Sequence, residues 1–288
     1  MVDDQSESPD QDEVPVVDTR EEVISAAKAT FDWRVRAATT LAQDVPAAYP
    51  GGPSHKAGAP VVVVTIGRGI HRLPLSFATP SSPALALSAA IKAATAAKVL
   101  RNSLVFDVHP GPTGSIEGIS DGTTVQLFDF FEQAFVSIVF SYQSIEAFAN
   151  EEVHRLVQRP YRVSFRGSLE DLDADAIERW LPTDQKLVDV IPAFVRVHAP
   201  KKAKWWSSFR SLTRLRNDTI HLKAGRAYPR TAIGLPPPSI FHELLATRSL
   251  LVFPITAAAA MRHFHEGREL PSWLTTAEQM IATELLGD

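Results

Sequence analysis

The sequence contains no cysteine. That absence excludes disulfide bonds, thiolate nucleophiles and cysteine-ligated zinc sites. No apolar run approaches the roughly 20 residues of a membrane-spanning helix without polar side chains interrupting it. The N-terminus is acidic, whereas a signal peptide opens on basic residues followed by an apolar stretch. We therefore expect a cytoplasmic protein that has no membrane partner.

The first 19 residues contain no Lys or Arg. They also contain few large apolar side chains, so little surface is available for burial, and this composition predicts a disordered acidic tail. The tail either raises solubility only or folds back on a basic site of the same chain. Its acidic residues are Asp3, Asp4, Glu7, Asp10, Asp12, Glu13 and Asp18.

Apolar residues make up 45% of the chain, enough for a substantial core. We assign residues 20–123 to an N-terminal helical or mixed region of unknown role and residues 124–288 to a helical domain. The Gly-, Pro- and Ser-rich stretch 109–124 is expected to be a loop at their boundary. The predicted fold class is mainly α, with an α-rich N-terminal extension that contains one or two short strands. Helices are expected over 21–45, 82–100, 124–152, 168–171, 183–197, 205–223, 239–265 and 273–286, and a strand over 61–66 followed by a turn at 67–69.

The helix expected from Thr124 has an unusually apolar surface. One seam repeats at alternating spacings of three and four residues, and other faces carry apolar side chains as well. A helix that is apolar nearly all round is buried in its own domain, against a second subunit, or both. The seam consists of Val125, Phe128, Phe131, Phe135, Ile138, Tyr142 and Ile145.

The stretch 205–223, WWSSFRSLTRLRNDTIHLK, is the chemical focus of the sequence. Trp205, Phe209, Leu212 and Leu215 recur at helical spacing, with no Pro or Gly between them, so the stretch predicts one amphipathic helix. Near its end the hexapeptide 216–221 places an arginine and a histidine five positions apart, with the polar Asn217 directly after the arginine.

The order of these segments resembles the HEPN superfamily (higher eukaryote and prokaryote nucleotide-binding). The chain has a long aromatic helix ending in IEAFANEE, a linker containing RWLPTDQKLVDVIP, and then WWSSFRSLTRLRNDTIH. HEPN domains are helical bundles marked by an arginine, four to six further residues and a histidine. The likeness covers about residues 124–265, and it leaves residues 1–123 unaccounted for.

The resemblance implies metal-independent RNA cleavage, without a cofactor, at a site formed where two such domains meet. It places Arg216 and His221 at the two motif positions and Asn217 at the polar position beside the arginine. Glu146 and Asn150, from the preceding long helix, are implied supporting residues. A toxin or phage-defence effector under control of a regulatory protein would fit this class, and some family members are non-catalytic binding or scaffold modules.

The residue types suit that chemistry independently of the resemblance. Histidine moves protons near neutral pH, whereas arginine stays charged and offers a fork of donors that matches phosphate oxygens. Metal-free cleavage needs both a general acid and a general base, and one chain supplies one motif histidine. A symmetric homodimer would supply two.

Helix geometry opens an alternative to the catalytic interpretation. Five residues rotate about 140° beyond the starting direction, so Arg216 leans toward the stripe of Trp205 and Phe209 while His221 lies on the opposite face. Arg216 would then be buried in a salt bridge, for example to Glu146, and His221 would be a solvated cation at the helix end.

Charge favours a polyanionic ligand. Between residues 199 and 230 the chain has nine Lys and Arg and one Asp, in a protein of net charge −4. Such a local excess of basic residues is typical of nucleic-acid binding. A solvated basic face that balances the acidic segments of the chain would give the same composition. The expected RNA-binding residues are Lys201, Lys202, Lys204, Arg210, Arg214 and Lys223.

Other kinds of site find little support. His263 and His265 are two positions apart, so on a helix they diverge and cannot chelate one metal ion. We therefore expect no metal site. The leading hypothesis is a HEPN-type endoribonuclease, and the rival is a catalytically silent RNA- or nucleotide-binding module or scaffold.

Overall fold

The computed structural model describes residues 32–40, 43–44, 46–47, 54, 56, 60–62, 64–69, 73–111, 114–221 and 239–286. The acidic tail and Lys223 lie outside these residues. The described residues form two compact units: one lies within residues 36–79, and the other comprises residues 32–35 and the described residues from Pro80 onward. The expected boundary near residue 123 therefore falls inside the second unit, because the helices on both of its sides pack together.

The first unit consists of short antiparallel strand pairs among its described residues. Strand β1 (Ala37–Thr40) pairs with β2 (Pro60–Val62), and β3 (Val64–Arg68) pairs with β4 (Pro74–Ala78). The prediction of a helix over 21–45 was wrong at β1, because pairing with a β-branched run outweighs the local preference of alanine for helix. Residues 21–31 lie outside the described part of the chain. The strand expected over 61–66 is present, but it is divided between β2 and β3.

The turn expected at residues 67–69 was also wrong. Gly67 and Arg68 continue β3, where they face Leu75 and Pro74 of β4. The connection starts one residue later, where the Gly69 N–H donates to the Leu73 carbonyl at 2.8 Å. Glycine next to a polar residue indicates a turn when the local sequence is considered alone. Here the pairing with β4 extends strand β3 through Gly67 and Arg68 instead.

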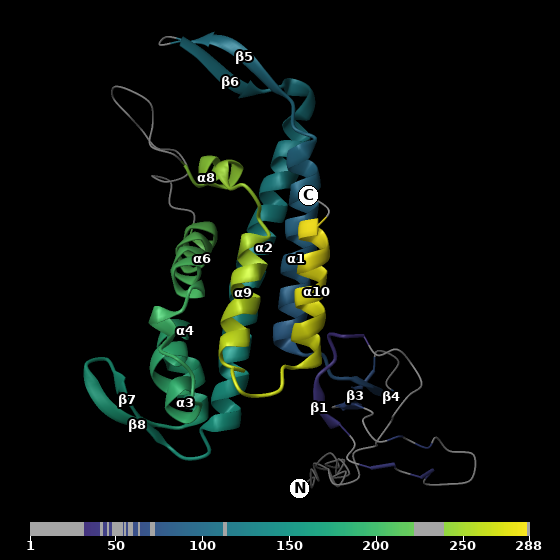
Figure 1. The fold of residues 1–288 in the computed structure, drawn as a ribbon, viewed down its shortest axis with the longest axis vertical. Helices are drawn as coiled ribbons and strands as arrows, with labels where there is room; N and C mark the ends of the chain where they lie inside the picture. The colour runs from purple at the N-terminus through teal and green to yellow at the C-terminus, as the bar shows by residue number, and fades with distance from the viewer. Residues whose placement is uncertain are drawn as a thin grey trace, which may run out of the picture. The chain divides into compact units, whose positions relative to one another are not determined.

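Two long helices form the centre of the second unit (Figure 1). Helix α1 (Ser82–Asn102) begins at Ser81, whose Oγ accepts the Ala84 N–H at 3.4 Å, and Pro83 occupies its first turn. Four of its alanines, Ala84, Ala90, Ala94 and Ala97, are completely buried, so the backbone of α1 approaches α2 (Thr124–Leu156) closely. By length and composition alone α1 could cross a membrane, yet 56% of its most apolar window is buried inside the protein, as in a core helix.

The segment expected to be a loop at residues 109–124 is largely a hairpin. Strands β5 (Phe106–Gly111) and β6 (Gly114–Ile119) pair antiparallel, and η2 (Asp121–Thr123) leads into α2. The N-terminal region thus holds more strands than the one or two expected. The Gly and Pro content had indicated a loop, but cross-strand pairs such as Val108 with Glu117 hold the segment together.

A second hairpin replaces the short helix expected over 168–171. Strands β7 (Tyr161–Phe165) and β8 (Ser168–Leu172) are joined by Arg166 and Gly167, whose φ values are 50° and 86°. Positive φ at both central residues is the geometry of the tight turn that suits strand twist, and glycine adopts it without strain. Glu170 and Asp171 therefore lie within β8, and Asp173, directly after it, caps α3 (Ala174–Trp180) by accepting the Ala176 N–H at 2.8 Å.

The helix expected over 183–197 is present but irregular and shorter. It runs as α4 (Thr183–Gln185), the π-helical η3 (Lys186–Val190) and α5 (Ile191–Phe194). The widened turn ends two residues before Pro192, which lacks the N–H that a regular turn would need there. The 3-10 turn η4 (Pro200–Lys202) then leads to α6 (Trp205–Ile220).

The single helix expected over 239–265 was wrong. The chain forms α8 (Ile240–Ala246) and α9 (Val252–His263), with a break between them, followed by α10 (Ser272–Leu286) as expected. A side chain from another helix explains the break: Arg101 of α1 donates to the carbonyls of Thr247 and Arg248. These carbonyls at the end of α8 are thereby satisfied without further helix.

Helix α2 contacts α1, α6 and α9, and α9 in turn contacts α1, α6 and α10, which makes the second unit a helical bundle (Figure 1). The mainly helical fold class is confirmed. Of the predicted seam, Ile138, Tyr142 and Ile145 are buried within the unit, whereas Val125 is 70% and Phe128 62% exposed. Among the described residues, Phe241 of α8 partly covers Phe131 and Phe135, so only the first residues of the seam stay exposed.

The C-terminal end of α2 is held by a buried carboxylate. Glu152 accepts hydrogen bonds from Arg155 at 2.6 and 3.0 Å and from Arg268 at 3.3 Å. Burial would raise the pKa of Glu152, but these arginines outweigh it and lower the pKa below 4.5. Beside them the ring of His265 packs on Phe148 with centroids 5.7 Å apart, and both of its ring nitrogens are buried.

We expect His265 to make the fold sensitive to mild acid. Burial, and then the charge of Arg268, lower the pKa of His265 below 6.5, so the unfolded chain binds a proton that the folded chain resists. Its contribution is therefore complete above pH 6.5 and lost as the pH falls below that value, whereas the contribution of Glu152 is lost only below pH 4.5.

The melting temperature at pH 7, 6 and 5 tests this expectation. The wild type should lose stability toward pH 5, and His265→Phe should lose clearly less over the same range. The control is His109→Gln, at an exposed position of β5, which should follow the wild type. An equal loss in the wild type and in His265→Phe would show that His265 is not the responsible group.

Candidate functional site

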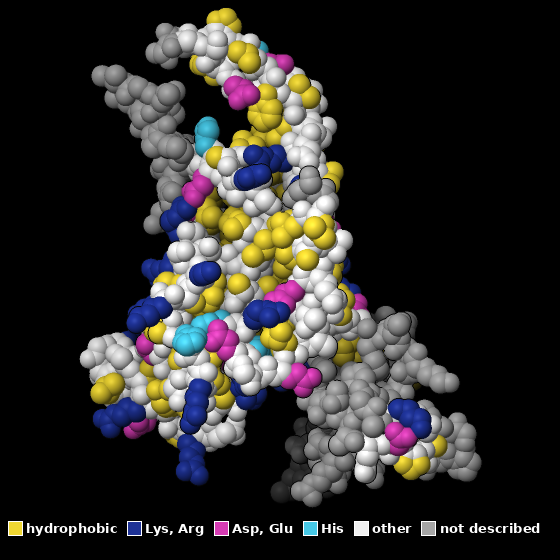
Figure 2. Space-filling model, in the orientation of Figure 1, with side chains coloured by type: hydrophobic (Ala, Val, Ile, Leu, Met, Phe, Trp, Pro, Cys, Tyr) yellow, Lys and Arg dark blue, Asp and Glu magenta, His cyan; other side chains and the backbone are white. Residues whose placement is uncertain are grey.

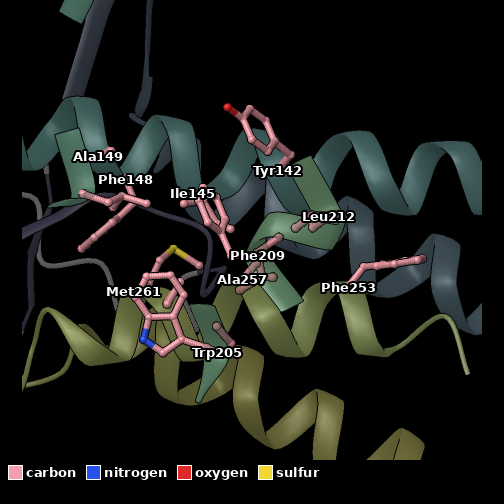
Figure 3. Close-up of a cluster of buried hydrophobic side chains, with 14 of the residues drawn as sticks. Tyr142, Ile145, Phe148, Ala149, Trp205, Phe209, Leu212, Phe253, Ala257 and Met261 are labelled. Carbon is pink, nitrogen blue, oxygen red and sulfur yellow. The ribbon is translucent and has the colours of Figure 1, made fainter. Parts of the chain in front are cut away.

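Helix α6 carries the predicted site and packs as its periodicity indicated. Trp205, Phe209, Leu212 and Leu215 are buried, and Figure 3 shows Trp205, Phe209 and Leu212 in the apolar cluster with side chains of α2 and α9. The helix ends at His221, whose φ of −111° and ψ of 61° leave the helical region. The last residues of the focal hexapeptide therefore form the end of a helix that the core holds in place.

Arg216 faces α2 and lies over an aromatic ring. Its guanidinium carbon is 4.9 Å from the centroid of the Tyr142 ring, and its Nη1–H donates to Asn217 Oδ1 at 3.0 Å. Cation–π contacts of this kind contribute about 0.5–2 kcal/mol, depending on how far the cation is desolvated. The side chain is only half-buried, so its planar group has a fixed orientation and stays accessible.

Tyr142 connects the hexapeptide to the core. Its ring stacks on Phe209 with centroids 6.3 Å apart and an interplanar angle of 8°. Burial raises the pKa of the Tyr142 hydroxyl above 10, the nearby Glu146 adds to this, and a hydrogen bond with Thr183 and the charge of Arg216 oppose it. The hydroxyl therefore stays protonated at neutral pH and can donate a hydrogen bond.

The two supporting residues predicted from the long helix lie on the same side of α2, but they bind different partners. Glu146 Oε1 accepts the Thr183 hydroxyl at 3.3 Å, close to Tyr142. Asn150 Oδ1 accepts a hydrogen bond from Lys186 Nζ at 2.7 Å. Glu146 thus belongs to the surroundings of Arg216, whereas Asn150 belongs to a neighbouring polar cluster.

Lys186 is the buried cation of that cluster. It is 2% exposed, and its ammonium group also donates to the Glu178 carbonyl at 2.7 Å. Burial lowers the pKa of Lys186 below 10.5, while the carboxylates of Glu146 and Glu178 oppose this shift. Lys186 lies in the π-helical turn, which carries its side chain inward between α2 and α3.

His221 is exposed at the end of α6, and its backbone N–H donates to the Asn217 carbonyl at 2.9 Å. Within the described residues no hydrogen bond, ion pair or ring contact joins the side chains of Arg216 and His221. The salt bridge between Arg216 and Glu146 that sequence geometry offered as an alternative is likewise not formed among these residues. The separation of the two side chains on the helix agrees with the rotation expected from their spacing.

The basic face is less positive than its sequence suggests, because other elements supply acids to it. Arg210 binds Asp184 at 3.3 Å, and Arg214 binds both Glu243 of α8 and Asp218. Figure 2 shows magenta carboxylates among the dark blue cations on the side of the second unit that carries α3, α4 and α6. The exposed cations Lys201, Lys202 and Lys204 have no ion pair within the described part of the chain.

A cavity of 440 Å³ lies beside this face. Trp206, Lys201 and Arg210 form part of its wall, together with Asp184 and Gln185. Trp206 is partly exposed, in contrast to the buried Trp205. Partly exposed indole rings next to cations are surfaces on which nucleobases stack.

Sequence reasoning missed Tyr142, Thr183 and Lys186. Tyr142 was counted as a member of an apolar seam, and its hydroxyl was the available signal, because a buried tyrosine usually needs a polar partner. Thr183 and Lys186 carried no signal in the sequence, since their role depends on the packing of α4 and η3 against α2. Among the described residues no group of three or more His, Asp or Glu side chains is arranged to hold a metal ion.

Searches with family models, curated proteins and solved structures found no match to this chain.

The contact between Arg216 and Tyr142 can be measured with a double-mutant cycle. We expect Tyr142→Leu and Arg216→Ala to be coupled by about 0.5–1 kcal/mol in the free energy of unfolding, because either change alone removes the cation–π contact. The control cycle pairs Tyr142→Leu with Arg262→Ala, whose guanidinium binds Glu278 of α10. Additive effects in both cycles would show that the contact contributes nothing.

Proposed function

We propose that the protein is a metal-independent endoribonuclease of the HEPN type, with the hexapeptide 216–221 as its catalytic segment. The observation that carries the proposal is the presentation of Arg216 and His221. Arg216 is held by Tyr142 and Asn217 with its guanidinium still accessible, and His221 lies exposed about 1.4 turns further along the same helix.

In the proposed reaction a 2′-hydroxyl attacks the adjacent phosphorus and the 5′-oxygen leaves. A base removes the proton of the 2′-hydroxyl, an acid gives one to the leaving oxygen, and His221 acts in these transfers. Arg216 neutralises the charge that develops on the phosphorane, and Asn217 keeps the guanidinium oriented. The products are a 2′,3′-cyclic phosphate and a 5′-hydroxyl, so atoms balance without any further reactant.

RNA binding along α6 is supported by side chains at its other end. Lys201, Lys202 and Lys204 are exposed there, and Trp206 lines the neighbouring cavity. Arg210 and Arg214 are paired with carboxylates, so we assign them a smaller part in binding than their charge alone would indicate. Phosphate neutralisation by the lysines would make binding strongly dependent on salt.

The alternative is a catalytically silent RNA-binding module, and one observation favours it. Among the described residues the ring of His221 has no hydrogen-bond partner that would fix its tautomer, and no contact joins it to Arg216. In catalytic histidines a neighbouring group usually performs that orienting role. A second chain could supply this orienting group, so the proposed catalysis requires the protein to form a dimer.

We expect EDTA-resistant cleavage of RNA to depend on both motif residues. His221→Ala and Arg216→Ala should each reduce cleavage at least a hundredfold, because proton transfer and phosphorane stabilisation each contribute about that much. RNA with a 2′-deoxy sugar at the scissile position should be inert, and the products should carry cyclic phosphate ends. Gel analysis of labelled RNA and mass spectrometry of the ends measure these outcomes.

Matched controls are His109→Ala and Arg179→Ala, which change exposed residues of β5 and α3 and should cleave like the wild type. If the wild type leaves RNA intact but binds it, the silent module is the correct function. Cleavage that requires added magnesium, or that survives His221→Ala, would place the active site elsewhere.

We also propose that the protein is a homodimer that uses the first turns of α2, whose apolar side chains are exposed among the described residues. Val125 and Phe128 are exposed there, and in Figure 1 this end of α2 points the same way as the C-terminal end of α6. A two-fold contact at this end would bury both side chains and bring two copies of His221 toward one another.

Phe128→Glu is therefore expected to convert the dimer to a monomer and to abolish cleavage while the fold is kept. Light scattering with the same samples as the cleavage assay measures both effects. Leu169→Glu, which changes another exposed apolar residue on β8, is the control and should leave the dimer intact. A wild-type protein that is monomeric at micromolar concentration and still cleaves RNA would contradict the dimer.

A further inference from the structure

A cavity of 1180 Å³ lies between the β5–β6 hairpin, the C-terminal ends of α1 and α10, and the break between α8 and α9. All of these elements belong to the second unit. In Figure 2 the surface is hollowed beneath the hairpin, and yellow and dark blue side chains gather there. The cavity is slightly larger than most small-molecule sites, which measure about 300–1,000 Å³, so it has room for an extended ligand. The ribonuclease proposal uses none of the residues in its wall.

Apolar side chains from three distant segments meet at this cavity and remain exposed. Phe106 of β5 is 46% exposed, Val252 of α9 is 39% exposed and Leu285 of α10 is 43% exposed. The buried Phe130 and Leu250 also line the cavity. Single exposed apolar residues are ordinary, but several that converge on one hollow are typical of a ligand-binding groove. The wall therefore offers an apolar surface to part of a ligand.

The charged side chains of the wall favour an anion. Lys98, Arg101 and Arg248 are basic, and Glu117 is the acid among the lining residues. Within the described residues neither arginine forms an ion pair, and the exposed side chain of Arg248 has no hydrogen bond. The positive charge of the two arginines is therefore not neutralised by carboxylates in the described part of the chain.

Arg101 is held in place without using all of its donors. Its Nη1 donates to the carbonyls of Thr247 and Arg248, the second at 2.8 Å, whereas its Nε and Nη2 have no acceptor among the described residues. A half-buried guanidinium with donors left over can bind a further oxygen acceptor at no cost in reorientation.

Hydrogen bonds from α1 also fix the shape of the cavity. Arg101 joins α1 to the break after α8, and Lys98 Nζ donates to the Glu284 carbonyl of α10 at 3.2 Å. Three sides of the wall are thereby tied to one buried helix. A site that exists before its ligand arrives loses little free energy to ordering on binding.

We infer that this cavity binds an amphipathic anion, an unbranched apolar chain that ends in a carboxylate or a phosphate. Arg101 and Arg248 bind the oxyanion, because the forked donors of guanidinium match the oxygens of both groups. The apolar chain lies against Phe106, Val252 and Leu285 and removes their surfaces from water. The inference goes beyond the proposed ribonuclease and does not depend on it, since it concerns other residues and another ligand.

The test titrates the full chain with ligands that differ in charge or in chain length. Decanoate and decyl phosphate are compared with decyltrimethylammonium, which has the same chain and the opposite charge, at concentrations below micelle formation. We expect at least one of the anions to bind at least tenfold more tightly than the cation in calorimetry, and the tighter anion identifies the headgroup. Decanoate should also bind at least tenfold more tightly than hexanoate, because each buried methylene contributes about fourfold.

Three variants assign the binding to this cavity. Arg248→Gln should reduce the preference for the anion severalfold, since it removes an exposed charge and leaves the helix break intact. Phe106→Ser should reduce the preference for the longer chain, and Leu285→Ser gives the same test from the opposite wall. The melting temperature of each variant shows whether it is folded.

The matched controls are Arg179→Gln and Leu169→Ser. They change an exposed arginine of α3 and an exposed leucine of β8, both outside this cavity, and should bind like the wild type. Absence of binding, or equal binding of the cation and both anions, would overturn the inference. So would anion binding that is independent of chain length, that survives all three changes, or that the controls reduce as strongly.

Discussion

The structure of the second unit depends on the close packing of α2 against its neighbours. Completely buried alanines of α1 let the two long helices approach, and α6 and α9 cover further faces of α2. Because interiors are packed as densely as organic crystals, a helix enclosed in this way has little freedom to shift. The orientation of α6, and with it the position of Arg216, follows from this enclosure.

A helix covered on several sides must still accommodate its polar residues, and α2 does so along one side. Tyr142, Glu146 and Asn150 are spaced four residues apart and face Thr183, Lys186 and Arg216 from three other segments. Each polar group there has a partner, as burial requires. The same row of partners that stabilises α2 in its surroundings also orients the arginine of the hexapeptide. Stability and the candidate site therefore share residues, and changes at Tyr142 are expected to affect both.

The two ends of α6 offer different chemistry. At the C-terminal end Arg216 and Asn217 are paired and His221 is open to solvent. At the N-terminal end the exposed Lys201, Lys202 and Lys204 have no ion pair within the described residues. The middle of the helix, where Arg210 and Arg214 bind carboxylates, is electrostatically nearer to neutral than either end.

The sequence by itself determined the mainly helical class and four of the helices, namely α1, the long α2, the amphipathic α6 and α10. Helical periodicity is a local property that each segment displays without its neighbours. It also indicated the hexapeptide and the rotation that separates Arg216 from His221. Tertiary structure alone decided three things. Strand pairing turned residues 106–119 and 161–172 into hairpins, since a strand depends on a partner that local composition does not name. Arg101 divided the expected helix over 239–265 by binding carbonyls far away in the chain. The carboxylates of Asp184 and Glu243 reduced the charge of the basic face, because electrostatic neutralisation depends on distance in space and not on position in the sequence.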